Sequence, residues 1–416
     1  MLSPSPIQVS RVSDPRLDIT GIGRRGEGLA MHDGRQVFVP YALPGETVIA
    51  TISGERAAIS RIEKASPARV QPFCPYFGTC GGCQLQHWDT IPYQAWKRGL
   101  VETTLHHRGI AVPVSDLIDA HGLGRRRVSL HVRRKDGNVA AGFMAARSHV
   151  LQAIDHCPIL VPALHNATTI ARRLGGKLGD CSVALTATNG GIDTAVKSER
   201  KIVEREAAKF AALGLELDLA RLSVNGETII TRSAPTVKMG RADVVLPADS
   251  FLQATEEGEK QLAALIADGI GKAKSVADLF CGCGPFALRL AENAHIAAFD
   301  NDKPAIAALG LSARTTPGLK PMEAAVRDLL REPLVANELK IFDAIVFNPP
   351  RAGAEAQSRQ IAKSKAKTVV AVSCDPVTLA RDAEILIGGG YRLETVTPVD
   401  QFKWTSHVET VAVFRK

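Results

Sequence analysis

The hydrophobic positions of the chain follow two different rhythms. Between Leu17 and about Lys64, short apolar runs are separated by turn signals such as Asp33-Gly34, and strands at this spacing indicate a small β-barrel of the oligonucleotide-binding type. From about residue 258, apolar bursts alternate with helix-like segments, which is typical of an open, mostly parallel α/β sheet. The bursts are Ser275–Phe280, His295–Phe299, Phe342–Phe347, Thr368–Val372 and Glu409–Phe414.

The stretch between these two parts mixes both patterns. Val128, Leu130 and Val132 alternate with polar neighbours, and Asp136-Gly137 marks a second hairpin turn. Ser198–Leu213 carries its charges on one face and predicts a helix. We therefore expect an α/β protein with four parts: a disordered tail (1–16), an OB-like β-barrel (17–70), a central α+β domain (71–235) and a C-terminal Rossmann-like α/β domain (236–416).

Composition places the chain among globular proteins. Of its 416 residues, 45% are hydrophobic and 23% are charged, which excludes wholesale disorder. No apolar run approaches the ~20 residues that a membrane span needs, and the N-terminus shows no signal peptide. Eight cysteines are far fewer than a disulfide scaffold contains. We therefore expect a cytoplasmic protein with reduced or metal-bound thiols, and the sequence indicates neither a membrane nor a protein partner.

The net positive charge is confined to the first half of the chain. Residues 1–235 contain 29 Lys/Arg and 21 Asp/Glu, whereas residues 236–416 contain 22 of each, so the net charge of +8 lies before residue 236. Its densest parts are Arg125-Arg126-Arg127 and Arg133-Arg134-Lys135. Such clusters suit a polyanion, although an isolated basic cluster is more often a solvated face. The asymmetry between the halves makes nucleic-acid binding as good an interpretation as a solvated face.

The first strand of the C-terminal part runs into a glycine turn. Gly282 and Gly284 remove side chains where a ligand has to meet the backbone. About twenty residues later the next strand ends in Asp300, whose carboxylate can accept both ribose hydroxyls of an adenosine. Together with Asp278 on the strand itself, this set favours an adenosine cofactor over a plain strand-turn-helix.

This stretch resembles the S-adenosylmethionine-binding class I methyltransferases. The resemblance implies that the cofactor is contacted by residues of the strand, the glycine turn and the next strand end: Asp278, Phe280, Gly282, Gly284 and Asp300. It also places Asp328 near the adenine amino group. A helix N-cap is nearly as good an interpretation of that acid.

Three further residues suggest a reactive site. Asn348-Pro349-Pro350 stiffens a strand end, because prolines fix φ, and presents the Asn348 amide. Cys374 ends the following strand; a lone cysteine is more often an inert core residue, but this position suits a nucleophile. Glu409 lies inside an alternating strand, where a carboxylate has to be paired or catalytic.

A thiol, a carboxylate and S-adenosylmethionine together suit methylation of uracil at C5. A thiolate that adds to C6 makes C5 nucleophilic enough to attack the methyl group, and a base then removes the C5 proton. The Asn348 amide matches the edge of uracil, because its oxygen accepts from N3–H and its NH₂ donates to O4.

Nearly the whole chain resembles the RNA uracil-5-methyltransferase family in its ribosomal-RNA branch, and the N-terminal barrel resembles a TRAM domain. The resemblance implies that Cys374 is the nucleophile, that Glu409 is the base and that Gln253 lines the cofactor and base pocket. The chain departs from the family pattern at three positions: Asn348 (usually Asp), Asp375 (usually Asn) and Thr255 (usually Asn). Members with a barrel and four cluster cysteines tend to act on 23S ribosomal RNA, so this RNA is the expected partner, with transfer RNA as the alternative.

Four cysteines form a separate pattern: Cys74, Cys80 and Cys83 lie close together, and Cys157 follows far downstream. Four thiolates suit either zinc or an iron–sulfur cluster, and spacing alone does not separate the two. The pattern resembles the family's 4Fe–4S site, which implies a structural cluster that pins the 71–84 loop to the segment around Cys157. The alternative is four reduced thiols with no metal.

Two other functions compete with uracil methylation. An amino-group methyltransferase also places Asn-Pro-Pro at a strand end, but it would follow this motif with an aromatic residue where this chain has Arg351, and it needs no nucleophilic cysteine. A non-catalytic RNA-binding protein needs none of Asp300, Cys374 and Glu409. The complete set therefore favours RNA uracil-C5 methylation.

Overall fold

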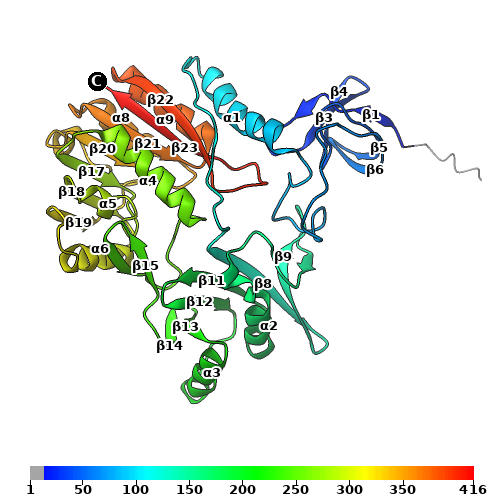
Figure 1. Ribbon diagram of the computed structural model, residues 1–416, viewed down its shortest axis with the longest axis horizontal. Helices are drawn as coiled ribbons and strands as arrows, with labels where there is room; N and C mark the ends of the chain where they lie inside the picture. The colour runs from blue at the N-terminus through cyan, green and yellow to red at the C-terminus, as the bar shows by residue number, and fades with distance from the viewer. Residues whose placement is uncertain (1–13) are drawn as a thin grey trace, which may run out of the picture. The chain divides into compact units, whose positions relative to one another are not determined.

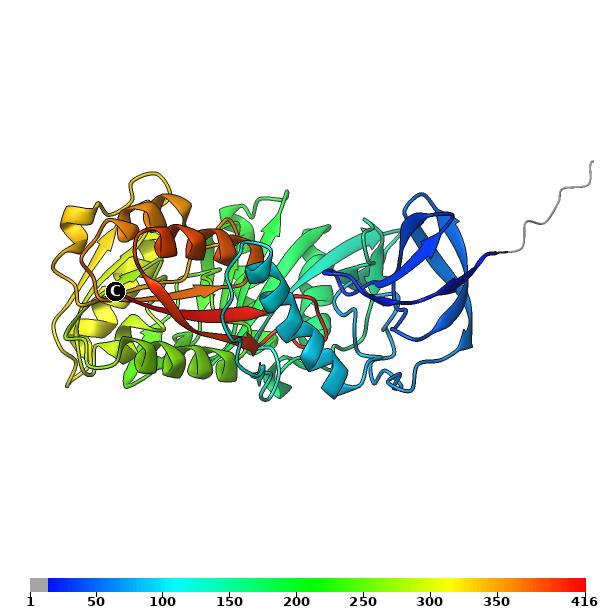
Figure 2. The same cartoon turned by 90° about the horizontal axis from the view of Figure 1, so that it is seen from above.

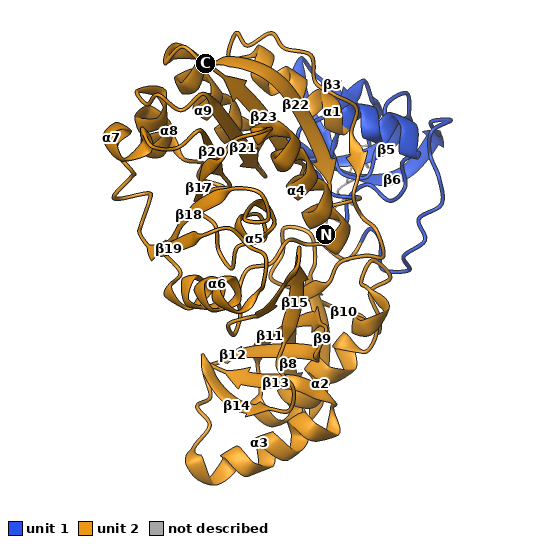
Figure 3. Ribbon diagram, turned by 60° about the vertical axis from the view of Figure 1, so that its left-hand side comes forward, with its two compact units in different colours: residues 1–78, 83–96, 404–406 blue, residues 79–82, 97–403, 407–416 orange. Residues whose placement is uncertain are grey.

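The structure is a computed structural model that describes residues 14–416, so most of the expected tail, residues 1–13, lies outside the described residues. The chain divides into two compact units (Figure 3). Unit 1 comprises the described residues up to Gly78 together with 83–96 and 404–406, and unit 2 comprises 79–82, 97–403 and 407–416. The boundary expected between residues 235 and 236 falls inside unit 2, where buried ion pairs join the two parts.

Unit 1 is built on a six-stranded, mostly antiparallel sheet. Its strands lie in the order β1 (Arg16–Asp18), β5 (Thr47–Ser53), β6 (Arg56–Lys64), β4 (Arg35–Val39), β3 (Gly28–His32) and β2 (Gly21–Ile22). The expected hairpin turn is confirmed, because Asp33 (φ 47°) and Gly34 (φ 77°) both adopt the left-handed backbone that a tight hairpin requires. β1 also contacts β3, so the sheet curls around a core of its own that includes Val39, Val48 and Ala50.

Unit 2 contains a seven-stranded sheet in the region of the expected central domain. Its strands lie in the order β10 (Leu151–Ala153), β9 (Asn138–Met144), β8 (Arg127–Lys135), β11 (Cys181–Thr188), β12 (Gly191–Ser198), β13 (Leu219–Val224) and β14 (Glu227–Thr231). The Asp136-Gly137 turn between β8 and β9 is confirmed.

Two helices pack on the seven-stranded sheet, α2 (Ala167–Leu178) on β8, β9 and β11, and α3 (Glu204–Glu216) on β13 and β14. A Cβ at Gly175 would lie 2.3 Å from Val132 Cγ1, so this glycine allows α2 to approach β8 closely. The helix expected at Ser198–Leu213 is wrong at its start, because Ser198 still belongs to β12 and the helix begins only at Glu204.

The C-terminal part of unit 2 is an eight-stranded sheet. Its strands lie in the order β19 (Met322–Val326), β18 (His295–Asp300), β17 (Ser275–Leu279), β20 (Ala344–Phe347), β21 (Thr368–Ser373), β23 (Glu409–Arg415), β22 (Arg392–Asp400) and β7 (Ile118–Asp119). β23 is antiparallel to both of its neighbours, and every other adjacent pair in the sheet is parallel. All five expected apolar bursts are strands; β19, β22 and β7 were not expected, because their apolar runs are shorter or interrupted.

Helices cover both faces of this sheet (Figures 1 and 2). α4 (Glu256–Ile270), α5 (Ala287–Leu290) and α6 (Lys303–Thr315) share one apolar core with one face. The part of α1 (Thr90–His106) from Lys97 onward, α7 (Ala336–Leu339), α8 (Glu355–Ala362) and α9 (Pro376–Gly388) share a second core with the other face. Because β17, β18, β20 and β21 are parallel, their carboxyl ends emerge at one edge of the sheet, which is where such folds bind ligands.

The remaining elements of unit 2 are short. β15 (Thr236–Met239) and β16 (Ala242–Val245) form a hairpin, and β16 packs on α6. A single turn of 3-10 helix, Pro162–Leu164, precedes α2. Within residues 14–416, no helix combines the length and the apolar character that crossing a membrane would require.

A buried ion pair holds the segment that follows the seven-stranded sheet in place. Arg221 on β13 donates to both carboxylate oxygens of Asp193 on β12, at 2.9 and 2.6 Å, and also to the carbonyl oxygen of Leu246, at 2.8 Å. Both charged side chains are more than nine-tenths buried. The pair therefore anchors the segment that leads from β16 into the C-terminal sheet.

We expect Asp193→Ala to lower the free energy of unfolding by about 3 kcal/mol, because it leaves the Arg221 guanidinium buried without its counter-ion. Glu216→Ala is the matched control, since it breaks an exposed pair with Arg173 and should cost less than about 1 kcal/mol. Urea denaturation of both variants measures the difference. Equal losses in the two variants would contradict the structural role assigned to the Arg221–Asp193 pair.

Candidate active site

The glycine turn after β17 has the backbone of a ligand-binding loop. Phe280, Gly282 and Gly284 all have positive φ angles, at 61°, 52° and 83°. A Cβ at Gly284 would lie 2.3 Å from Leu309 of α6, so this glycine is needed for helix packing. A Cβ at Gly282 would meet nothing within 4 Å, so here the missing side chain leaves the backbone open to a ligand. The positive φ of Phe280 is unusual for a bulky residue and is typical of strained functional loops.

Asp300 joins the ends of β17 and β18. One carboxylate oxygen accepts a hydrogen bond from the Gly282 amide at 2.8 Å, and the other accepts one from the Asp302 amide at 2.8 Å. These bonds hold the carboxylate beside the open face of Gly282. Each oxygen retains a further lone pair, so the arrangement fits the expected contact with the ribose hydroxyls.

Asp278 lies behind this loop. Its side chain is fully buried, and neither carboxylate oxygen has a hydrogen-bond partner in the part of the chain that the structure describes. Burial raises the pKa of Asp278 to about 8, the nearby Ala287 amide opposes this effect, and the charge of Asp300 adds to it. Asp278 is therefore a largely neutral acid at pH 7, and its contact with the cofactor stays a prediction.

Asp328 caps a turn, and the helix expected to follow it is absent, since the next helix of the described residues begins at Ala336. Its Oδ1 accepts hydrogen bonds from the amides of Leu330 and Arg331 at 3.2 and 3.3 Å, and its Oδ2 lies 3.6 Å from the Arg331 guanidinium. The side chain caps a turn after β19. The expected contact with the adenine stays a prediction.

Asn348 and Cys374 follow β20 and β21 at the same edge of the sheet. The backbone N–H of Asn348 donates to the carbonyl oxygen of Leu279 on β17 at 3.2 Å. The side chain of Asn348 is half-buried, and its amide makes no hydrogen bond within residues 14–416. Cys374 is half-buried between β21 and α9. Burial raises the pKa of the Cys374 thiol to about 11; the charge of Glu409 adds to this effect and Arg351 opposes it. The thiol is therefore protonated in the resting protein.

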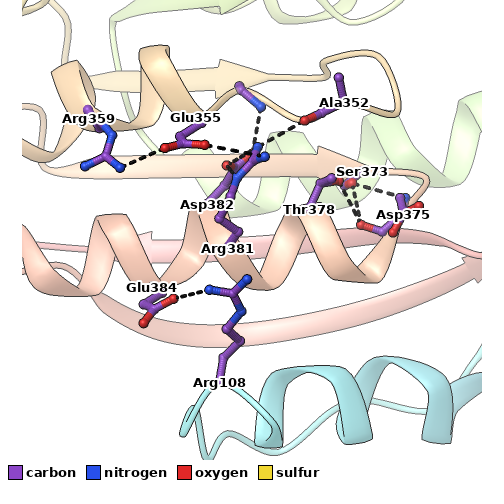
Figure 4. Close-up of polar contacts among 11 residues, drawn as sticks. Arg108, Ala352, Glu355, Arg359, Ser373, Asp375, Thr378, Arg381, Asp382 and Glu384 are labelled. Atoms are coloured by element: carbon purple, nitrogen blue, oxygen red, sulfur yellow. Dashed lines mark hydrogen bonds and ion pairs between the residues drawn. The ribbon is translucent and has the colours of Figure 1, made fainter.

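A polar network ties the loop after β20 to α9 (Figure 4). The buried Asp382 carboxylate accepts a hydrogen bond from the Ala354 amide at 2.8 Å. Arg381 donates to the Ala352 carbonyl oxygen at 3.1 Å and pairs with both Asp382 and Glu355. Cys374 is followed by Asp375, the N-cap of α9. This network therefore connects the loop that carries Asn348 to the loop that carries Cys374.

Two of the departures from the family pattern have a structural explanation. Asp375 is the N-cap of α9 and accepts a hydrogen bond from the Val377 amide at 2.9 Å. Thr255 is the N-cap of α4, accepts from the Gly258 amide at 2.9 Å and donates to the Ala120 carbonyl oxygen at 2.6 Å. Asp, Thr and Asn are all favourable N-caps, so these replacements keep the helix ends intact.

Glu409 is buried, with 4% of its surface exposed, and has two unequal oxygens. Oε1 accepts a hydrogen bond from Nε2 of Gln401 at 3.1 Å, whereas Oε2 has no partner among the described residues. Burial raises the pKa of Glu409 to about 7, and the hydrogen bond from Gln401 opposes this effect. In the antiparallel pair of β21 and β23, Ser373 lies opposite Thr410, so the next residues in this register, Cys374 and Glu409, are neighbours.

Gln253 is linked to Glu409 through the side chain of Gln401. The sequence analysis did not identify Gln401. Gln401 Nε2 donates to Oε1 of Gln253 at 2.6 Å, and both side chains are buried. Gln401 directly follows β22, a strand whose hydrophobic pattern is too irregular to be expected. A polar residue at a strand's carboxyl end was the signal that could have identified it.

The Arg125–Arg127 cluster has a different role from the one expected. Arg126 is buried, forms an ion pair with Glu259 of α4 and donates to the Gln253 carbonyl oxygen at 3.1 Å. Arg127 is half-buried, with its guanidinium 5.7 Å from the centre of the Phe251 ring. The expectation that Arg126 faces a polyanion is therefore wrong, because the buried carboxylate of Glu259 requires its charge. Exposed basic side chains are found further along the hairpin, at Arg133, Arg134 and Lys135.

The four cysteines of the expected cluster are divided between the units. Cys74 and Cys83 belong to unit 1, and Cys80 and Cys157 to unit 2; all four are half-buried. The Gly82 amide donates to the Cys80 sulfur at 3.4 Å, a type of bond that also tunes iron–sulfur ligands. Among residues 14–416, no three Cys, His, Asp or Glu side chains are arranged to hold one metal ion, so the cluster stays a prediction.

The strand order of the C-terminal sheet, its antiparallel β23 and the glycine turn after β17 define a class I methyltransferase fold. Comparison with a solved structure agrees with this class. The chain superposes on the tRNA (uracil-54, C5)-methyltransferase of Pyrococcus abyssi in complex with S-adenosyl-L-homocysteine, with a TM-score of 0.75 and 22% identity, over 96% of this chain and 99% of that one.

Sequence comparisons define the family. Residues 323–416 match the family described as tRNA (uracil-5-)-methyltransferase. The chain is 44% identical to an uncharacterized RNA methyltransferase of Brucella suis, over 96% of this chain and 98% of that protein. It is 34% identical to the 23S rRNA (uracil(1939)-C(5))-methyltransferase of Halomonas elongata, over 98% of this chain and 91% of that protein. The chain belongs to the RNA uracil-5-methyltransferase family and is an S-adenosylmethionine-dependent enzyme.

The charges around Cys374 predict opposite effects of two substitutions on its alkylation by iodoacetamide. Glu409→Gln removes a charge that raises the pKa of the thiol, so alkylation at pH 8.5 should become about threefold faster. Arg351→Ala removes a charge that lowers the pKa, so alkylation should become slower. Peptide mass spectrometry measures the rate at Cys374, and buried Cys283 in the same digest reports any general opening. A change of the same sign in both variants would contradict the electrostatic assignment.

Proposed function

We propose that this enzyme methylates C5 of a uridine in 23S ribosomal RNA, with Cys374 as the nucleophile and Glu409 as the base that removes the C5 proton. The observation that carries the proposal is the buried Glu409 carboxylate, one of whose oxygens has no partner among the described residues. Glu409 is next to Cys374 in the register of β21 and β23, at the edge where class I methyltransferases bind their cofactor. A buried carboxylate without a counter-ion is costly, so a catalytic role explains why the fold keeps it.

The steps assign each group a separate task. The Cys374 thiol first loses its proton to water, and the charge of Arg351 favours the resulting thiolate. Its sulfur then bonds to C6, and the C5=C6 electron pair moves onto the ring as an enolate. S-adenosylmethionine supplies an electrophilic methyl group to C5. Glu409 then takes the C5 proton, the C5=C6 double bond forms again and Sγ leaves as the thiolate. With a pKa of about 7, Glu409 is ionised to a large extent at the pH where it has to accept this proton.

The cofactor is proposed to lie over the glycine turn. The open face of Gly282 and the fixed carboxylate of Asp300 fit an adenosine, with Phe280 beside them and Asp278 behind them. Asn348 and Gln253 border the same edge. The uncommitted side-chain amide of Asn348 is proposed to read the uracil edge, where an acceptor and a donor face N3–H and O4.

The structure favours the β8–β9 hairpin over the N-terminal barrel as a source of electrostatic affinity. The side chains of Arg133, Arg134 and Lys135 are exposed on this hairpin. In contrast, residues 17–70 contain 7 Lys/Arg and 6 Asp/Glu, so the barrel carries almost no net charge. We propose that the hairpin contacts RNA phosphates and that the barrel contributes through shape rather than charge.

The choice of 23S ribosomal RNA rests on the relative from Halomonas elongata, which matches nearly the full length of both proteins. The solved structure with the same fold is a transfer-RNA enzyme, so transfer RNA is the second candidate. An exocyclic-amine methyltransferase that uses Asn348-Pro349-Pro350 is a third, and the product distinguishes it from the other two.

We expect the enzyme and S-adenosylmethionine to form 5-methyluridine in unmodified 23S ribosomal RNA, and Cys374→Ala to abolish the product. Nucleoside mass spectrometry measures it. Cys181→Ala, which alters a buried cysteine of β11, is the control and should retain activity. A methylated amine that persists in Cys374→Ala would reject the proposed chemistry, and product in transfer RNA alone would reject the proposed substrate.

We also propose that Cys74, Cys80, Cys83 and Cys157 bind a structural 4Fe–4S cluster. Anaerobically purified enzyme is then expected to be brown and to contain about four iron atoms per chain. Cys157→Ser should lower the iron content, whereas Cys181→Ser should leave it unchanged. Colourless, iron-free protein from the anaerobic preparation would reject the cluster.

A further inference from the structure

The side chain of Gln401 makes three hydrogen bonds, two of them to proposed active-site residues, Glu409 and Gln253. This side chain is completely buried. Nε2 donates to Oε1 of Glu409 at 3.1 Å and to Oε1 of Gln253 at 2.6 Å, while Oε1 accepts from the Ala254 amide at 2.9 Å. Both amide hydrogens and the oxygen are therefore in use.

These contacts determine how the amides are oriented. The backbone N–H of Ala254 can only donate, so it requires the oxygen of Gln401 on its side and places the Gln401 NH₂ group toward Glu409 and Gln253. Because that NH₂ group can only donate, Gln253 in turn has to present its oxygen to Gln401. The NH₂ group of Gln253 then remains for the substrate side.

We propose that Gln401 is a positioning residue that holds the Glu409 carboxylate with Oε1 occupied and Oε2 open to the C5 proton, and that orients Gln253 as a donor. This inference rests on the proposed function, because it gives Glu409 the role of base. A hydrogen bond that is donated to a carboxylate favours its ionised form, so Gln401 also keeps Glu409 competent to accept a proton near neutral pH.

The backbone on both sides of Gln401 is fixed by one buried ammonium group. Lys97 of α1 donates to the Asp400 carboxylate, and also to the Phe402 carbonyl oxygen at 3.2 Å. The Lys97 side chain is fully buried, and Asp400 is 1% exposed. Asp400 and Phe402 flank Gln401 in the sequence, so this anchor leaves Gln401 little freedom to move away from Glu409.

The charged surroundings of Glu409 are balanced on the other sides. On β22, Asp400 is paired with Lys97, and on α4, Glu259 is paired with Arg126 and Arg289. On the β21 side the neighbouring titratable group is Cys374. Gln401 is therefore the group whose loss should change the pKa of Glu409 without changing the local charge.

The test measures the release of tritium from RNA labelled at uridine C5, as single-turnover rates between pH 5.5 and 9.5. In the wild-type enzyme the rate should rise with pH through the pKa of Glu409, because the ionised carboxylate is the active form. Gln401→Met keeps the volume but removes the donor, so the pKa should rise and the midpoint should move up by about one pH unit. Below the midpoint this corresponds to a rate about tenfold lower.

Gln357→Met is the matched control. Like Gln401, Gln357 of α8 is completely buried. Its Oε1 accepts a hydrogen bond from the Leu334 amide at 2.9 Å, and its Nε2 donates one to the Leu334 carbonyl oxygen at 3.0 Å. This variant should lose comparable stability in thermal melts and keep the wild-type midpoint. Gln401→Glu is a second variant, since it keeps the acceptor for Ala254 but places a like charge beside Glu409, and its midpoint should lie at least as high as that of Gln401→Met.

The outcomes separate the two proposals. An unchanged midpoint in both Gln401 variants, with uniformly lower rates, would overturn the positioning role. The same shift in Gln357→Met would overturn it as well, because the effect would then be a general response to a lost buried amide. If the wild-type enzyme itself releases no tritium and forms no 5-methyluridine, the proposed function fails and not merely the role of Gln401.

Discussion

One buried carboxylate, that of Glu259 in α4, connects the parts of unit 2. It pairs with Arg126 just before β8 and, at 2.8 Å, with Arg289 of α5, which follows the glycine turn after β17. Arg126 donates in addition to the carbonyl oxygen of Gln253. Loss of Glu259 would leave the buried Arg126 guanidinium without its counter-ion, which is far more costly than breaking a surface pair. The start of the seven-stranded sheet, the helix after the glycine turn and Gln253 are therefore all joined through this one acid and Arg126.

The burial that makes this ion pair strong also shifts the pKa values of three residues of the proposed active site. The pKa values of Asp278, Glu409 and Cys374 are all raised, in each case first of all by burial. This interior disfavours charge, so near pH 7 Asp278 and the Cys374 thiol are mostly neutral while Glu409 is partly ionised. On the proposed mechanism, a neutral pyrimidine ring then meets an uncharged Cys374 thiol, and charge on the sulfur and the ring develops along the reaction.

Sequence analysis located the residues at strand ends, because an apolar burst and the polar residue after it are neighbours in the chain. Asp300, Asn348 and Cys374 were found in this way. It missed Gln401, Lys97 and Glu259, whose partners lie 148, 303 and 133 positions away. No local period records such contacts, since they arise only when the fold brings distant segments together. For the same reason, the Arg125–Arg127 cluster was assigned to a surface although Arg126 is buried.

On the proposed mechanism, Cys374 acts as the nucleophile before Glu409 acts as the base, and the closeness of the two groups favours this order. The ionised carboxylate raises the pKa of the thiol, so thiolate and carboxylate oppose each other and titrate as a pair. Once the sulfur is bonded to C6 it is a neutral thioether, and this opposition disappears. Glu409 is then free to ionise at the step at which the C5 proton has to be removed. Gln401 favours the ionised carboxylate without adding a charge of its own and so supports this second step.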